Sequence, residues 1–114
     1  MKNQKSNPDI VSLSIRKLFI ECNLIHFNQS LPNSLVSAEW SNKLKINVST
    51  TYQGNTGTYI IRLNKPMLIS YTLNEVKELL LHEMIHVHLF LTKRQSYSDY
   101  TNGGHGPVLV FTLS

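Results

Sequence analysis

Apolar residues recur at a helical spacing in the first quarter of the chain. They fall three or four positions apart, as residues on one face of an α-helix do. The series consists of Val11, Ile15, Leu18, Phe19, Cys22 and Ile25. Pro8 suits a first helical turn, and the turn-forming segment LPNS follows at residues 31–34. We therefore expect one helix from about Pro8 to Phe27, after a flexible tail over residues 1–7.

Alternating apolar and polar residues replace this spacing in the middle of the chain. In KLKINVST, residues 43–50, the side chains of Leu44, Ile46 and Val48 alternate with polar ones, which predicts a half-buried strand. The turn signal QGNTG and the strand-like run TYIIRLN follow directly, so an antiparallel hairpin is expected. SAEWS, residues 37–41, is a further short strand candidate.

A second, longer helical pattern covers TLNEVKELLLHEMIHVHLFLTKR, residues 72–94. Thr72 with Glu75 three residues later forms a capping-box sequence, and Lys93 and Arg94 suit a helix C-terminus. A polar loop follows over residues 95–104. The order of helix, strands, helix and loop predicts an α+β fold in which a small sheet packs on helices.

Composition narrows the class of protein. With 114 residues, 41% of them hydrophobic and 16% charged, the chain is expected to form one globular domain. One cysteine, Cys22, excludes a disulfide framework and a cysteine-based zinc site, and we expect it in the core. We find no signal-peptide pattern and no run of about 18 apolar residues, so an intracellular protein without a membrane partner is expected. A net charge of +4 permits contact with nucleic acid but does not establish it.

The chemistry lies in HEMIHVHLF, residues 82–90, where polar side chains interrupt an apolar helix. His82 and His86 are one helical turn apart, about 40° on a helical wheel, so both imidazoles can reach one zinc ion. Glu83 lies further round the helix, where it can accept a proton from the attacking water; this is the H-E-x-x-H arrangement. A third ligand is needed, and His105 in GGHGP is the candidate.

Other polar residues have competing interpretations. A buried histidine of the motif could instead form its hydrogen bond with a backbone carbonyl. The third histidine downstream favours a metal site over this alternative. His88 lies about 160° from His86 on the wheel, so we expect a packed or partly exposed residue, and His26 is expected to be structural. Asp99 could orient a ligand histidine, but a surface carboxylate in a loop is the favoured interpretation.

These motifs resemble the SprT-like metallopeptidases, and among them the Spartan-type DNA-dependent proteases of eukaryotes. The resemblance is carried by LLLHEMIHVHLFLT with GGHGP, and by NPDI, AEWSNKL with Trp40, and IRLNKPML in the same order, over about residues 7–107. It implies a zincin-like domain with a short antiparallel or mixed three-stranded sheet. It also implies that His82, His86 and His105 bind Zn²⁺ and that Glu83 is the general base.

The resemblance also implies partners and a location. Spartan-type proteins are proteases that degrade proteins trapped on DNA and contact single-stranded or distorted DNA. A nuclear, chromatin-associated protein is therefore expected, with the cytoplasm as the alternative and a monomer as the expected state. Basic residues that could contact phosphates, or could simply be solvated, are Lys43, Lys45, Arg62 and Lys65.

The chain departs from the family pattern after the third histidine. The family continues G-H-G-P with an acidic residue, a phenylalanine and a further helix, whereas this chain reads GHGPVLVFTLS. We expect a SprT-like domain over residues 8–114 that is short at its C-terminal end. Two alternatives stay open: a catalytically weak or inactive fragment that binds zinc and DNA without turnover, and a small zinc peptidase with no link to DNA.

Overall fold

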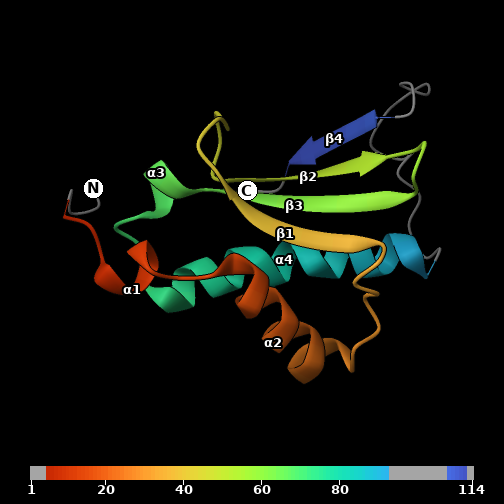
Figure 1. The fold of residues 1–114 in the computed structure, drawn as a ribbon, viewed down its shortest axis with the longest axis horizontal. Helices are drawn as coiled ribbons and strands as arrows, with labels where there is room; N and C mark the ends of the chain where they lie inside the picture. The colour runs from red at the N-terminus through yellow and green to blue at the C-terminus, as the bar shows by residue number, and fades with distance from the viewer. Residues whose placement is uncertain (1–4, 93–107, 113–114) are drawn as a thin grey trace.

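The computed structural model describes residues 5–92 and, for residues 108–112, the backbone (Figure 1). The helices are α1 (Pro8–Val11), α2 (Ile15–Phe27), α3 (Lys65–Leu68) and α4 (Leu73–Leu91), and the strands are β1 (Val36–Ser41), β2 (Val48–Gln53), β3 (Thr58–Asn64) and β4 (Val108–Thr112). In this part of the chain, no helix has the length and apolar character needed to cross a membrane. The division into a tail over residues 1–7 and a domain over residues 8–114 stays a prediction.

The four strands form one mixed sheet in the order β1-β3-β2-β4. Strand β1 runs parallel to β3, whereas β2 is antiparallel to both β3 and β4. Helices α2 and α4 lie together on one face of the sheet (Figure 1). The predicted α+β class and the predicted hairpin are confirmed, and β4 adds a strand to the three that were expected.

The core lies between this face of the sheet and the two long helices. Alternate residues of β3 point toward the helices and are buried, as the period of a strand requires. Helix α4 contributes a matching apolar stripe. The fully buried side chains of α4 are Val76, Leu80, Met84 and Val87, together with Glu83.

The single N-terminal helix predicted over residues 8–27 is wrong, because the chain breaks at Ser12–Ser14 into α1 and α2. The Ser12 hydroxyl donates to the Pro8 carbonyl, and the Ser14 hydroxyl accepts from the Lys17 amide as the N-cap of α2. Serine side chains compete with helical hydrogen bonds in this way. The Trp40 indole N–H also donates to the Leu13 carbonyl at 2.9 Å, which anchors the break to β1.

The strand predicted over residues 43–50 is also partly wrong, since only its last three residues belong to β2. The segment before Val48 is held mainly by a side chain of β3. The buried Asn64 amide donates to the carbonyls of Leu44 (2.9 Å) and Ile46 (3.1 Å). Its carbonyl accepts from the Met67 amide as the N-cap of α3. Although its apolar residues alternate as in a strand, this segment is a loop that hydrogen bonds attach to the sheet.

Replacing Asn64 with alanine is expected to destabilise the fold by about 2–3 kcal/mol. The variant loses a helix cap, worth about 1 kcal/mol, and two hydrogen bonds to part-buried carbonyls, worth about 1–2 kcal/mol together. Urea denaturation measures the change. Asn42→Ala, at an exposed position in the connection between β1 and β2, is the matched control. Equal midpoints for the two variants would contradict this role of Asn64.

Candidate active site

Helix α4 places the predicted catalytic motif against the sheet. Its first turn is fixed by the predicted capping box, which is confirmed. The Glu75 amide donates to the Thr72 hydroxyl at 3.1 Å, and the Thr72 amide donates to the Glu75 carboxylate at 2.9 Å. Since the apolar stripe of the same helix is fully buried, the residues of the motif are held on a rigid, tightly packed element.

His82 and His86 lie side by side on α4. Their ring centroids are 5.4 Å apart and their planes differ by 27°. His82 is exposed and His86 is half-buried, so both rings are on the accessible side of the helix. Two imidazoles one turn apart at this separation are a donor set that suits a transition metal such as zinc.

Glu83 lies at the interface between α4 and β2, where it is 0% exposed. Its Oε1 accepts a hydrogen bond of 2.6 Å from the hydroxyl of Thr50, which is also fully buried. Its Oε2 is buried and has no hydrogen-bond partner among the described residues. A buried carboxylate oxygen without a partner is unusual in a structural role and points to a function.

Burial changes the acidity of this carboxyl. Loss of solvation raises the pKa of Glu83 from 4.5 to about 7, and the hydrogen bond from Thr50 opposes the rise. A carboxyl that titrates near neutral pH is suited to take up and release a proton under physiological conditions.

The raised pKa of Glu83 predicts how the stability of the metal-free protein depends on pH. Below pH 4.5 both the folded and the unfolded chain hold the proton; between pH 4.5 and about 7 only the folded chain retains it. Stability should therefore fall as the pH rises through this window, by about 3 kcal/mol if one pKa unit is worth about 1.4 kcal/mol. Urea denaturation with a chelator present, from pH 4 to pH 8, measures the loss.

Two variants separate this effect from other titrations. Glu83→Gln removes the group and should remove the slope, whereas Glu78→Gln, at an exposed position of the same helix, should keep it. Identical pH profiles for the wild type and Glu83→Gln would contradict the buried carboxyl.

The remaining predicted ligand is not placed. His105, and with it Asp99, lies outside the described residues. Within residues 5–92, no group of three or more histidine, cysteine, aspartate or glutamate side chains could hold a metal ion together. The described part of the site therefore consists of His82, His86 and the buried Glu83, and the third ligand stays a prediction.

The other histidines lie apart from the site. His88 is half-buried, and its ring packs against that of Phe27 with centroids 5.6 Å apart, which agrees with the expected packing role. His26 is exposed in the last turn of α2. Cys22 is buried in the core, as expected.

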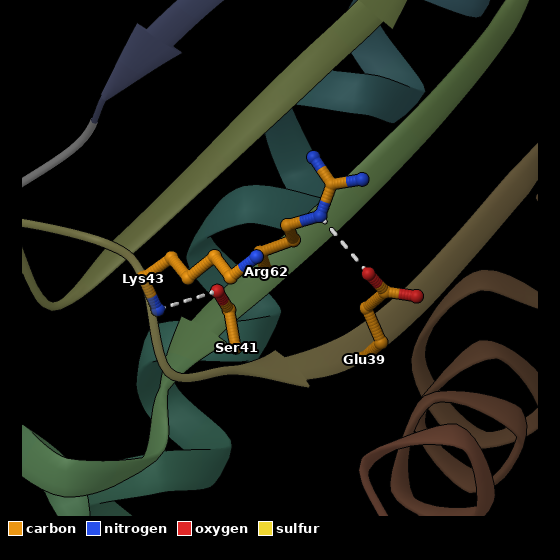
Figure 2. A network of polar contacts seen from close by, with 4 residues as sticks. All are labelled: Glu39, Ser41, Lys43 and Arg62. Carbon is orange, nitrogen blue, oxygen red and sulfur yellow. Dashed lines mark hydrogen bonds and ion pairs between the residues drawn. The ribbon is translucent and has the colours of Figure 1, made fainter.

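The four basic residues considered for DNA contact have different surroundings. Arg62 pairs with Glu39 at 2.9 Å across β3 and β1 (Figure 2). The Lys65 ammonium donates to the Val11 carbonyl at 3.0 Å and lies 5.6 Å from the centre of the Trp40 ring.

Lys43 and Lys45 lie instead in the connection between β1 and β2, and both are exposed. The Lys43 amide donates to the Ser41 hydroxyl at 3.1 Å, which turns the chain at the end of β1 (Figure 2). Of the four, these two lysines are therefore the ones most accessible to phosphates.

One residue of the site was not predicted from the sequence. The sequence places Thr50 only in a strand, because nothing in its local sequence points to Glu83, which is 33 residues away. The signal in the sequence is the polar run Ser49, Thr50 and Thr51, since Thr50 takes a position on the same face of the strand as Val48. The structure buries all of these residues.

Comparison with known proteins assigns the family. The model of the SprT-like family matches residues 15–111, which include β1 to β3, all but the last residue of β4, both long helices and the H-E-x-x-H motif. The chain belongs to the SprT-like family. The resemblance to SprT-like metallopeptidases that the sequence motifs indicate is thus confirmed over residues 15–111.

Individual relatives agree with this assignment. The chain is 35% identical over 94 residues to the DNA-dependent metalloprotease SPRTN of Rattus norvegicus and 34% identical over 94 residues to that of Homo sapiens; each match covers 82% of this chain and 18% of the relative. It is 35% identical over 97 residues to the DNA-dependent metalloprotease dvc-1 of Caenorhabditis elegans, covering 82% of this chain and 25% of the relative. The SprT-like chain thus spans about a quarter or less of the length of these relatives.

Proposed function

We propose that this SprT-like chain is a zinc-dependent endopeptidase that hydrolyses proteins bound or crosslinked to DNA. The observation that carries the proposal is the combination, on one packed helix, of two adjacent imidazoles and a buried glutamate with one unpartnered oxygen. The family and the relatives named DNA-dependent metalloproteases support this reaction class and this substrate class.

His82, His86 and His105 are the proposed ligands of Zn²⁺. The donor set fits, because imidazole nitrogens suit zinc, the first two rings are adjacent, and three protein ligands are usual in a catalytic site. When bound, zinc polarises the scissile carbonyl and makes a water molecule more acidic.

Glu83 is the proposed general base. Its Oε2 takes a proton from the attacking water, and the same carboxyl then donates that proton to the amine that leaves when the peptide bond breaks. The low exposure of the carboxyl limits access of bulk solvent, and in the metal-free protein burial raises its pKa to about 7.

The same assignment leads us to propose a chromatin-associated protein of the nucleus that contacts single-stranded or distorted DNA. The net charge of +4 favours such contact. Lys43 and Lys45 are the proposed contributors among the described residues, because both are exposed on the same connection.

The experiment that tests this function measures cleavage of a basic DNA-binding protein by the purified chain. We expect about one zinc ion per chain, loss of cleavage with a chelator, recovery on adding zinc, and stimulation by single-stranded DNA. Zinc bound without cleavage under every DNA condition would favour an inactive zinc-binding fragment. Cleavage that is indifferent to DNA would favour a peptidase with no link to DNA.

Replacing both Lys43 and Lys45 with alanine is expected to weaken binding to single-stranded DNA. Each phosphate contact that is lost should reduce the slope of log affinity against log salt by about 0.7, hence by about 1.4 for the pair. Fluorescence anisotropy over a salt series measures the slope. The control replaces Lys17 and Lys77 of the two helices, and equal slopes for both double variants would contradict a specific role for this connection.

A further inference from the structure

We propose that Thr50 is a positioning residue for the reaction: its hydroxyl fixes Glu83 Oε1 so that Oε2 is the oxygen that exchanges the proton. This inference rests on the proposed function and adds to it a residue outside the helix. It starts from the 2.6 Å hydrogen bond between Thr50 Oγ1 and Glu83 Oε1.

The hydrogen bond is strong and well protected. A hydroxyl that donates to a carboxylate at this distance is in the short range typical of charge-assisted bonds. Both residues are fully buried, so water does not compete with the contact. Because the two oxygens of a carboxylate are otherwise equivalent, this one donor makes them different.

The donor itself has little freedom. Thr50 is in the middle of β2, where it is in register with Ile61 of β3 on one side and with Phe111 of β4 on the other. A strand paired on both sides fixes the backbone, and branching at Cβ restricts the threonine side chain to few rotamers. The sheet therefore defines the position of the Glu83 carboxylate relative to His82 and His86.

A purely structural role explains the geometry less well. A buried acid that only joins a helix to a sheet would be expected to have both oxygens satisfied. Here Oε2 is buried and unpartnered among the described residues, while Oε1 is held at a short distance. This asymmetry is what a general base requires, namely one oxygen for orientation and one for the proton.

The test compares Thr50→Val, which removes the hydroxyl at nearly constant volume, with Thr50→Ser, which keeps it. In the zinc-loaded protein, we expect Thr50→Val to lower kcat by about 10- to 100-fold with KM and zinc content unchanged. Thr50→Ser should recover most of the rate. Thr51→Val, on the opposite face of the same strand, is the control and should leave kcat unchanged.

Several outcomes overturn the proposal. One is full activity of Thr50→Val in an enzyme that Glu83→Gln inactivates; another is a loss of rate that Thr50→Ser does not recover. An inactive wild type would overturn the proposed function instead. The hydrogen bond between Thr50 and Glu83 is then tested by thermal unfolding of the metal-free variants Thr50→Val, Glu83→Gln and the double variant. Non-additive shifts in Tm support the coupling of the two residues, and additive shifts refute it.

Discussion

Replacing His86 with alanine is expected to reduce bound zinc from about one ion per chain to almost none and to abolish proteolysis. His86 supplies one of two adjacent imidazoles whose ring centroids are 5.4 Å apart. Three protein ligands are usual for catalytic zinc, so the loss of one leaves a set that holds the metal poorly. Elemental analysis after dialysis, and cleavage of a basic protein with single-stranded DNA present, measure the two effects.

The chain supplies matched controls for this variant. His88 is on the same helix but packs against Phe27, and His26 is exposed on α2. Alanine at either position should leave the zinc content and the cleavage rate near wild type. If His86→Ala retained a full equivalent of zinc, or if His88→Ala lost it, the assignment of ligands would be wrong.

Replacing Glu83 with glutamine is also expected to abolish turnover, but with zinc retained. Glutamine has nearly the same shape, and its side-chain oxygen can still accept the hydrogen bond from Thr50. It cannot take a proton from water at neutral pH. General acid–base catalysis contributes about 10²- to 10⁴-fold, so cleavage should fall by at least that range.

This loss has to be separated from an effect on folding. Glu83→Gln should unfold at a temperature no lower than the wild type at pH 8, because it removes a buried charge. Glu78→Gln, exposed on the same helix, should match the wild type in both turnover and zinc content. A Glu83→Gln protein that has lost its zinc would show that the glutamate serves the metal and not the proton.

Patterns that depend on neighbouring residues made much of the fold predictable. The long helix follows from its apolar spacing and its capping box, and the hairpin follows from β-rich segments on either side of a glycine turn. The errors arose where a distant residue decided the structure. Trp40 anchors the break between α1 and α2, and Asn64 turns the predicted first half of a strand into a fastened loop.

In the site, too, local features could be predicted from the sequence and contacts between distant segments could not. His82, Glu83 and His86 could be proposed from sequence because a single helix fixes their spacing. Burial of the carboxyl and its hydrogen bond to Thr50 could not, since they depend on how β2 packs against α4. The pairing of Arg62 with Glu39 likewise depends on the register of β1 and β3, which the sequence does not reveal.

The account depends most on Glu83 as the proton acceptor of a metal-dependent protease, and one comparison tests this directly. The wild type and Glu83→Gln, each loaded with zinc, are incubated with a basic DNA-binding protein, with and without single-stranded DNA. The account predicts digestion by the wild type that DNA stimulates, and none by the variant. Equal digestion by both forms would contradict it.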